Sequence, residues 1–316
     1  MAVVKLKPAF KSYLWGGHRL KEEFSKNFTD DKVAETWELS MHDDGPSVVI
    51  SGEHSGLTLK EYVDKQGKEV LGVNGNNFDF FPILVKFIDA AQDLSIQVHP
   101  DDAYALEVEG EYGKNEMWYI LDAEEDAFIY YGTNQELSQE AFRSAIENNE
   151  VLDTLKQVPV KAGDVIYVEA GTIHAIGAGI LLCEVQQNSN TTYRVYDFNR
   201  KDKDGNLREL HIDQAIEVSK LSPLDSDFSP RGEIVEENGL VSQLLLKTPY
   251  FETTSLTISQ EAFINVDETS FVGLICLEGN VQVDELTLNK GETAFVEANT
   301  GSVKLNGNGR LLKVSV

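Results

Sequence analysis

Short runs of β-branched, aromatic and aliphatic residues follow one another along most of the chain, separated by Gly, Asn and Asp. Runs of this length between turn residues predict strands, and many short strands favour a sandwich or a barrel. The chain is therefore expected to be mainly β. The clearest runs are VVI at 48–50, FPILVKFI at 81–88, MWYIL at 117–121, AFIYYG at 127–132, VIYVEA at 165–170, ILLCEVQQ at 180–187 and TTYRVYDF at 191–198.

Helical patterns are fewer than strand patterns. Thr58 and Glu61 have the spacing of a capping box, and Asp101 and Asp213 can each cap a following helix. Between residues 138 and 157 apolar side chains recur at helical spacing, which predicts a longer helix. We expect these helices to be insertions among the strands.

One pattern occurs twice in the chain. GDVIYVEA, from Gly163 to Ala170, resembles GETAFVEA, from Gly291 to Ala298, and a pair of predicted strands precedes each copy. Such repetition predicts a duplicated β-barrel module. The first copy continues to a histidine, His174, whereas the second continues to Ser302 without one. Only the first module is therefore expected to bind a metal.

A segment rich in Pro, Ser, Asp and Gly lies at residues 222–238. Composition of this kind marks loops and domain boundaries. We therefore predict two domains. The first, at residues 1–236, contains the helices and the candidate site. The second, at residues 237–316, consists almost purely of strands and lacks metal ligands.

Residues that can bind a metal lie in or beside three predicted strands. Gln97 and His99 are two positions apart, so their side chains point to the same face of an extended segment. Glu116 begins the next strand, and His174 follows the turn of the first repeat. Two imidazoles, a carboxylate and an amide oxygen suit Zn²⁺ with room for water or a substrate, and Fe²⁺ or Mn²⁺ could use a similar set.

Three charged residues accompany the candidate ligands. Glu184 lies in a strand after His174; if buried beside a cation it can transfer protons, and a solvent-facing position is the alternative. Arg194 lies between two strand tyrosines, where an arginine either packs in a salt bridge or holds an oxyanion. Lys114 shares a face with Glu116 if that segment is extended, although lysines at loop ends are more commonly surface residues.

The overall charge narrows the class of partner. Lys and Arg total 27 and Asp and Glu total 53, which gives a net charge of −26. Such a surface repels nucleic acid and anionic lipid, yet a few local cations can still hold one small phosphorylated molecule. Two cysteines and an N-terminus without a long apolar segment indicate a cytoplasmic protein without a disulfide scaffold. We expect a monomer or a homodimer.

Six blocks carry a family resemblance: YLWGGHRL at 13–20, AETWELSMH at 34–42, IQVHPDD at 96–102, GKNEMWYIL at 113–121, AGTIHAIG at 170–177 and EVQQNSNTTYRVYDFNR at 184–200. In this order they resemble the blocks of type I mannose-6-phosphate isomerases of the short bacterial form. The segment from Gly163 to His174 is also similar to the second motif of cupins, with Glu169 where cupins commonly carry Pro.

The resemblance implies two cupin-type jelly-roll modules and a zinc-dependent aldose–ketose isomerase. It implies interconversion of mannose 6-phosphate and fructose 6-phosphate by proton transfer between C1 and C2 through a cis-enediol(ate). Beyond Arg194 the chain departs from the long eukaryotic forms, so further phosphate contacts stay open, with Arg200 and Lys201 as guesses. The implied residues are Gln97, His99, Glu116 and His174 for one Zn²⁺, and Arg194, Glu184 and Lys114 for catalysis.

Two other functions are compatible with a cupin barrel. Another cupin metalloenzyme, such as an iron-dependent oxygenase or a different sugar-phosphate isomerase, would use a similar barrel, but an oxygenase has no evident need for a phosphate-holding Arg194. A non-enzymatic sugar-phosphate sensor would not need the metal ligands, all of which are present. The chain has no GxGxxG, P-loop or GxSxG pattern that would indicate nucleotide or serine-hydrolase chemistry.

Overall fold

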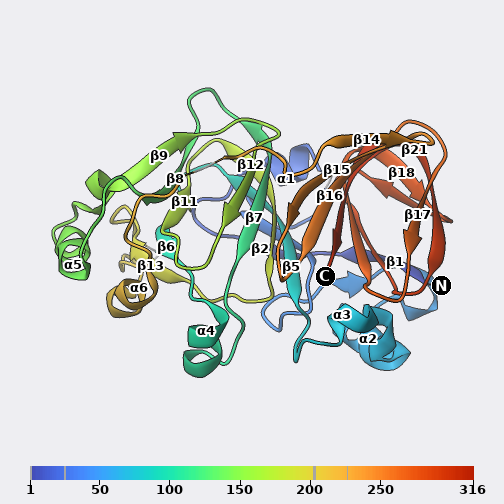
Figure 1. Cartoon of the computed structure of the whole chain (residues 1–316), viewed down its shortest axis with the longest axis horizontal. Helices are drawn as coiled ribbons and strands as arrows, with labels where there is room; N and C mark the ends of the chain where they lie inside the picture. The colour runs from blue at the N-terminus through green and yellow to red at the C-terminus, as the bar shows by residue number, and fades with distance from the viewer. Residues whose placement is uncertain (1, 25, 202–203, 226) are drawn as a thin grey trace.

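The structure is a computed structural model that describes residues 2–24, 26–201, 204–225 and 227–316. Figure 1 shows two β-rich units side by side, with short helices at their edges. Within the described ranges the strands form three sheets, and the paired strands in them are antiparallel. The mainly β class predicted from the hydrophobic runs is therefore confirmed.

Two sheets that face each other form what we call the first β unit. The six-stranded sheet has the order β10-β7-β12-β5-β3-β2, and the five-stranded sheet has the order β13-β6-β11-β8-β9. Apolar side chains from both sheets meet between them, including Ile88 and Trp118 from one and Ile129 and Ile176 from the other. The strands are β2 (Ala9–Lys11), β3 (Glu35–Leu39), β5 (Ile83–Ala90), β6 (Ile96–Val98), β7 (Glu116–Ala123), β8 (Phe128–Thr133), β9 (Leu155–Pro159), β10 (Val165–Val168), β11 (His174–Ile176), β12 (Ile180–Gln187) and β13 (Tyr193–Tyr196).

The ten-stranded sheet forms the second β unit. Its order is β14-β15-β16-β21-β18-β20-β1-β4, with β17 beside β21 and β19 beside β18, and it encloses an apolar core of its own. The strands are β1 (Val3–Lys7), β4 (Val48–Val49), β14 (Ile234–Glu237), β15 (Leu240–Lys247), β16 (Glu252–Ile258), β17 (Ala262–Val266), β18 (Val272–Val283), β19 (Leu286–Asn289), β20 (Thr293–Val296) and β21 (Gly301–Ser315).

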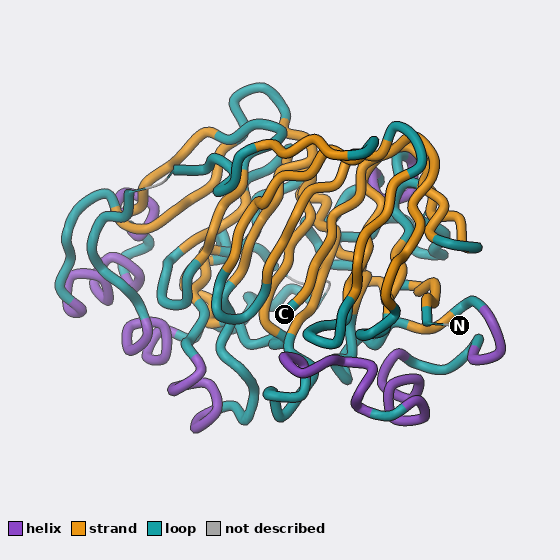
Figure 2. Tube along the Cα trace, turned by 45° about the vertical axis from the view of Figure 1, so that its right-hand side comes forward, coloured by secondary structure: helices purple, strands orange, loops and turns teal. Residues whose placement is uncertain are grey.

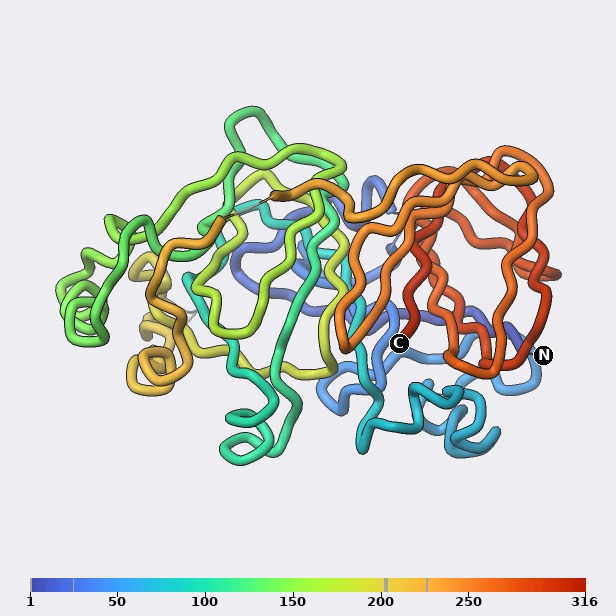
Figure 3. Tube along the Cα trace, viewed as in Figure 1, coloured from blue at the N-terminus to red at the C-terminus, as the bar shows by residue number. Residues whose placement is uncertain are grey.

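Both ends of the chain contribute to this second sheet. β1 pairs with β20, so that Val3 lies opposite Val296, and the N-terminal trace runs beside the C-terminal strands in Figure 3. The sheet therefore draws on residues from both sides of the predicted boundary. The division into 1–236 and 237–316 stays a prediction about the order of segments along the chain.

The outer face of the six-stranded sheet packs against the second unit. Its apolar residues, such as Phe87 and Cys183, join Phe271 and Phe295 of the second unit in one continuous core. Within this interface the ammonium of Lys26 lies 2.6 Å from Oε1 of Glu38, both side chains being buried. The two units therefore share a core, because the outer face of the six-stranded sheet packs directly against apolar residues of the ten-stranded sheet.

The helices lie at the edges of the sheets, most of them along one side, as Figure 2 shows. None of the helices in the described ranges is long and apolar enough to cross a membrane. The α-helices are α1 (Arg19–Glu22), α2 (Leu59–Gln66), α3 (Gly72–Gly75), α4 (Asp102–Val108), α5 (Gln139–Glu147) and α6 (Ile212–Val218), and the 3₁₀ turns are η1 (Gly52–His54), η2 (Lys68–Leu71) and η3 (Val151–Thr154).

Two of the predicted helix caps are confirmed. The hydroxyl of Thr58 accepts a hydrogen bond from the backbone N–H of Glu61, whose carboxylate accepts from Thr58 in return, so α2 begins with a complete capping box. The carboxylate of Asp101 accepts from the N–H of Tyr104 at the start of α4.

Two other helix predictions are wrong. The helix expected over 138–157 ends at Glu147, because Asn149 adopts a left-handed backbone with φ 59°, and β9 occupies the end of the range. Asp213 is not a cap: it lies in the first turn of α6, and its carboxylate pairs with Arg143 at 2.7 Å.

Candidate metal centre and active site

The inner face of the six-stranded sheet carries charged residues at one end and apolar residues at the other. In β12, Glu184 is followed toward the N-terminus by Leu182 and Ile180 on the same face. Lys86 lies opposite Glu184 in β5, and Trp118 lies opposite it in β7. The alternation of each strand thus brings the charged side chains together at one end of the first β unit.

The five-stranded sheet supplies a second row of polar side chains. His174 in β11 lies opposite Gln97 in β6, and Gln97 lies opposite Arg194 in β13. Directly opposed residues project from the same face of a sheet, so these three side chains form one row. His99 follows β6 two positions after Gln97 and extends the row toward Glu116.

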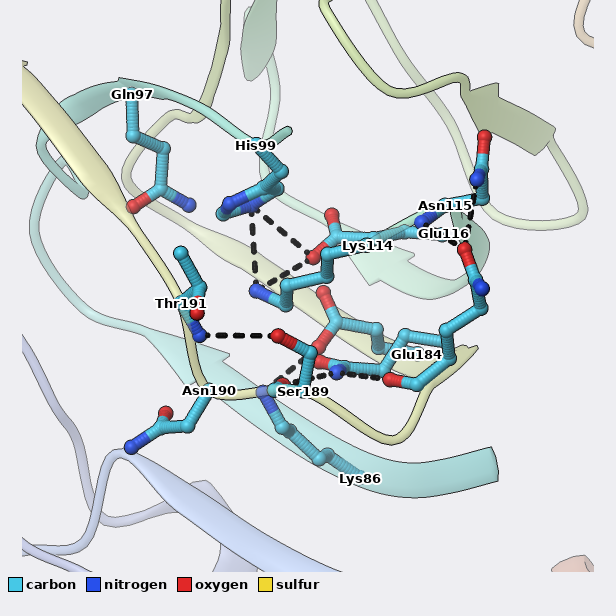
Figure 4. Close-up of polar contacts among 12 residues, drawn as sticks. Lys86, Gln97, His99, Lys114, Asn115, Glu116, Glu184, Ser189, Asn190 and Thr191 are labelled. Atoms are coloured by element: carbon cyan, nitrogen blue, oxygen red, sulfur yellow. Dashed lines mark hydrogen bonds and ion pairs between the residues drawn. The ribbon is translucent and has the colours of Figure 1, made fainter. Parts of the chain in front are cut away.

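Three of the predicted metal ligands meet at one point. Nε2 of His99 lies 3.3 Å from Oε1 of Glu116, and Nε2 of His174 lies 3.8 Å from Oε2 of the same carboxylate. All three side chains are buried, and one ligand atom from each lies within 4.8 Å of the others. Gln97 joins them, with its Nε2 3.4 Å from Nε2 of His174. Figure 4 shows His99, Glu116 and Lys114 converging.

Hydrogen bonds leave the nitrogen of each imidazole that points into the cluster without a proton. The carbonyl oxygen of Thr172 lies 2.8 Å from Nδ1 of His174, so that nitrogen carries the proton and Nε2 keeps its lone pair. Nζ of Lys114 lies 3.2 Å from Nε2 of His99, and because lysine only donates, this nitrogen accepts. Both imidazoles are therefore in the neutral form that binds a metal.

The electrostatics of the cluster favour the same protonation state. Burial, reinforced by the charge of Lys114, lowers the pKa of His99 to about 3, and burial lowers the pKa of His174. Burial acts to raise the pKa of Glu116, but Lys114 and His99 outweigh it and hold that pKa well below its ordinary value. At neutral pH the site thus offers two neutral imidazoles and one carboxylate.

Glu184 is a buried carboxylate next to this cluster. The indole N–H of Trp118 donates to Oε2 of Glu184 at 2.9 Å and also to Oε2 of Glu116 at 3.1 Å, which ties the two carboxylates together. Nζ of Lys86 lies 3.0 Å from Oε1 of Glu184. Burial first, and then the negative charge of Glu116, raise the pKa of Glu184 above its ordinary value. Glu184 is therefore better placed to exchange a proton near neutral pH than an ordinary glutamate.

A cavity of about 270 Å³ opens beside the cluster. It brings together four of the predicted site residues, Gln97, Lys114, Glu184 and Arg194, while the other three form the metal cluster beside it. The residues that line it are Tyr13, Trp15, Glu35, Lys86, Ile88, Leu94, Ser95, Gln97, Lys114, Ile176, Glu184, Asn190, Thr192, Arg194 and Arg208.

Lys86 and Arg208 line the cavity but were missed as site residues in the sequence. Lys86 is a single charged residue in the apolar run FPILVKFI, which is the signal that could have identified it. Arg208 follows no strand pattern and reaches the cavity only through the loop after β13. Arg200 and Lys201, named from the sequence as further candidates for phosphate contact, do not line the cavity in the described part of the chain.

One wall of the cavity is a loop that Glu111 holds in place. Oε2 of Glu111 accepts hydrogen bonds from the hydroxyl of Ser189 at 3.1 Å and from the backbone N–H of Asn190 at 3.0 Å. Its other oxygen lies 3.2 Å from Nε2 of His42, whose Nδ1 accepts from the N–H of Asp44 and whose Nε2 therefore donates. The hydrogen bond from His42, with those from the loop, lowers the pKa of Glu111 to about 2.

Comparison with known proteins assigns this architecture to a family. A family model described as phosphomannose isomerase type I, catalytic domain, matches residues 3–135, and one described as mannose-6-phosphate isomerase, cupin domain, matches residues 242–316. The chain is 38% identical over 306 residues to mannose-6-phosphate isomerase ManA of Bacillus subtilis, covering 95% of both chains. It is 38% identical to mannose-6-phosphate isomerase of Streptococcus mutans, covering 93% of this chain and 92% of that one.

The fold agrees with the sequence comparison. The crystal structure of mannose 6-phosphate isomerase from Bacillus subtilis superimposes with a TM-score of 0.91 at 34% identity, over 100% of both chains. Similarity over the full length, together with the buried histidine–glutamate–histidine cluster, leaves one assignment. The chain belongs to the type I mannose-6-phosphate isomerases, a family of aldose–ketose isomerases with a cupin domain.

Proposed function

We propose that the protein interconverts D-mannose 6-phosphate and D-fructose 6-phosphate with one Zn²⁺ at the buried cluster. The observation that carries the proposal is the position of Glu184, a buried carboxylate that shares the indole N–H of Trp118 with Glu116 and lines the cavity with Arg194. The reaction needs one base that reaches two adjacent carbons, and stabilisation of the charge that develops on their oxygens.

The residues of the cluster fit Zn²⁺. His99 and His174 supply imidazole nitrogens, Glu116 supplies a carboxylate oxygen, and the amide of Gln97 reaches the same point. Zn²⁺ accepts such a mixed set and keeps room for another ligand in catalytic sites. When bound, the ion supplies a fixed positive charge that polarises nearby oxygen atoms.

Glu184 performs the proton transfer in this mechanism. Its carboxylate removes the proton from C2 of the aldose, which leaves a cis-enediol(ate), and returns the proton to C1 while the hydroxyl proton on O2 passes to O1, which gives the ketose. Contacts with Lys86 and Trp118 fix both carboxylate oxygens, so one group on one face of the substrate serves both carbons. The raised pKa of Glu184 brings acid and base forms closer in energy.

Lys114 and Arg194 hold the substrate in this mechanism. Lys114 lines the cavity and lies 2.8 Å from Oε1 of Glu116, so its ammonium can donate to the oxygens on C1 and C2 as negative charge develops there. Arg194 lines the cavity on β13, and its guanidinium holds an oxyanion of the substrate. A cytoplasmic location and a monomeric or homodimeric state stay predictions from the sequence.

The test is an isomerisation assay with mannose 6-phosphate on the purified protein, as prepared, after chelation, and after addition of Zn²⁺. We expect activity to disappear with the metal and to return with zinc. Activity that persists in protein with no metal, as measured by elemental analysis, would contradict the role given to Zn²⁺. No turnover by folded, zinc-loaded protein would contradict the substrate.

A further inference from the structure

Three guanidinium groups gather around a single carboxylate at one end of the cavity. Arg208 binds Asp197 through two hydrogen bonds, from Nε at 2.7 Å and from Nη2 at 2.5 Å. Arg200 also binds Asp197, and Arg194 lies close enough for its charge to be felt by the other two. Positive charge is therefore in excess here, in a chain whose net charge is −26.

Of the three arginines, Arg194 has the fewest hydrogen bonds and ion pairs to balance its charge. Its only side-chain hydrogen bond among the described residues runs from Nη1 to the backbone oxygen of Glu209 at 3.0 Å, and its buried Nε has no partner. No carboxylate of the described ranges lies within ion-pair distance of it. A buried, unpaired donor on a cation is costly unless a ligand completes it.

Arg208 and Arg194 are brought to the same part of the cavity. Arg208 immediately precedes Glu209, whose carbonyl oxygen contacts the guanidinium of Arg194, and both arginines line the cavity. The side chain of Arg208 is 27% exposed, so part of it remains open to a ligand. Arg200 does not line the cavity, because its Nη1 binds the backbone oxygen of Asp93 instead.

The arginines lie at a distance from the metal cluster that suits a sugar phosphate. His174, Gln97 and Arg194 occupy adjacent strands, so two inter-strand steps, roughly 10 Å, separate the first backbone from the last. A hexose 6-phosphate carries its reacting carbons at one end and its phosphate at the other. A molecule with C1 and C2 at Glu184 therefore directs its phosphate toward Arg194 and Arg208.

We propose that Arg208 binds the phosphate group of the substrate together with Arg194, and that Asp197 positions Arg208 for this contact. The inference rests on the proposed function and specifies which side chains recognise the phosphate. Guanidinium groups bind phosphate oxygens through paired, charge-assisted hydrogen bonds. The two bonds to Asp197 use Nε and Nη2, which fixes the plane of the fork and leaves Nη1 for the ligand. A dianion between Arg194 and Arg208 also relieves their mutual repulsion.

The experiment compares Arg208→Ala, Arg208→Lys and the surface control Arg143→Ala in the zinc-loaded enzyme. Steady-state kinetics give kcat and KM for mannose 6-phosphate, and inorganic phosphate serves as a competitive inhibitor that probes the phosphate contact alone. For Arg208→Ala we expect KM and the inhibition constant of phosphate to rise together by about 10- to 100-fold, with kcat within about threefold. Arg208→Lys keeps the positive charge but loses the paired donors of the guanidinium. Its KM and its inhibition constant of phosphate should therefore lie between those of the wild type and of Arg208→Ala.

Unchanged KM and inhibition constant in folded Arg208→Ala would overturn the proposal. So would a loss confined to kcat, because Arg208 would then act on the reacting atoms. If the wild-type enzyme does not isomerise mannose 6-phosphate, calorimetric titration with inorganic phosphate still compares wild type with Arg208→Ala. Failure of the proposed function is thus separated from failure of the phosphate contact.

Asp197→Asn tests the positioning role. The amide keeps the shape but loses the charge that orients Arg208, so the inhibition constant of phosphate should rise several-fold while zinc content and kcat stay at wild-type values. In the Arg208→Ala background, Asp197→Asn should not raise the inhibition constant of phosphate any further, because the guanidinium that Asp197 orients is already absent. Additive losses in the double variant would show that Asp197 acts through general stability and would overturn its positioning role.

Discussion

The repeated motif occupies the same place in the two β units, yet in the described residues only the first unit holds a buried histidine–glutamate–histidine cluster. In each copy the first glycine adopts a left-handed backbone, with φ 92° at Gly163 and 88° at Gly291, and a short strand follows, β10 in one unit and β20 in the other. β10 pairs with β7, and β20 pairs with β18, in corresponding registers. The two units can therefore be compared position by position.

The difference lies on the inner face of the neighbouring strand. Opposite the last valine of the motif, β7 carries the candidate ligand Glu116, whereas β18 carries Val272. Two positions further along, Trp118 in the first unit corresponds to Leu274 in the second. Where the first unit places a carboxylate and an indole that bridges two carboxylates, the second places aliphatic side chains.

The interiors of the two units differ in the same way. Within residues 227–316 as described, the buried polar residues are Thr253, Ser255, Ser270 and Thr293, and none carries a formal charge. The first unit buries His99, Glu116, His174, Lys86 and Glu184. Burial of charge is costly and shifts pKa values, so groups of this kind concentrate where chemistry occurs. The same β framework thus accommodates either an apolar interior or one with buried charged groups.

The largest effect is expected from removing a ligand that the second unit lacks. His174→Ala should abolish zinc binding and lower activity by about 10³-fold or more, because the metal supplies several kcal/mol of charge stabilisation. Ser302→Ala, at the corresponding point after the second motif, should leave both at wild-type values. Elemental analysis and the isomerisation assay measure them, and full zinc occupancy in His174→Ala would contradict the ligand assignment.

The next largest effect separates the proton carrier from the metal. Glu184→Gln keeps the shape of the side chain but cannot accept the proton, so kcat should fall by about 10²- to 10⁴-fold with zinc retained. Glu236→Gln, an exposed residue of the second unit, serves as the control. Wild-type kcat in Glu184→Gln would remove the proton-transfer role.

A substitution of Lys86 turns part of the reactive interior into an apolar one. Lys86→Met leaves Glu184 and Glu35 buried without their cation, which should lower the free energy of unfolding by about 3–5 kcal/mol. Leu274→Met in the second unit should cost less than about 1.5 kcal/mol. Chemical denaturation measures both, and equal losses would contradict the contrast between the interiors.

The same variant has a defined effect on pH dependence. Lys86 favours the ionised form of Glu184, so its removal should raise the pKa of Glu184 further. Catalysis requires the ionised base, and the acidic limb of the kcat/KM profile should therefore move to higher pH. A limb that stays in place would show that another group controls it.

The smallest effect is expected at the loop that forms one cavity wall. Glu111→Gln weakens the hydrogen bonds to Ser189 and Asn190, and KM should rise about fivefold with little change in kcat. Because the pKa of Glu111 is about 2, the carboxylate stays ionised at working pH, so the rise should be the same at pH 6 and pH 8. Glu169→Gln, which breaks an exposed ion pair with Lys220, is the matched control.

The metal cluster was predictable because its positions follow local rules. Gln97 and His99 share a face through the period of a strand, and the repeated motif placed His174 just after a turn. The structure brings these residues to Glu116, but their roles as ligands stay a proposal. The capping box at Thr58 is equally local, since every group in it lies within one helical turn.

The remaining features depend on contacts between distant segments. Arg208 becomes part of the cavity only because the chain returns beside β13 and Asp197 holds it there. Glu111 acquires a role through a loop almost 80 positions later in the sequence. The helix predicted to residue 157 ends at Glu147 before the left-handed Asn149, and the last residues of the range pair with β8 as part of β9. Hydrophobic periodicity does not carry such information.

The pairing of β1 with β20 also sets the timing of folding during synthesis. Val296, the partner of Val3, is translated about 290 residues after it. At about 5–20 residues per second, the first strand waits roughly 15 to 60 s for its neighbour. The contact between β1 and β20 therefore forms only after β20 has been synthesised, and a nascent chain arrested before β20 would leave that edge of β1 unpaired, with β4 on its other edge.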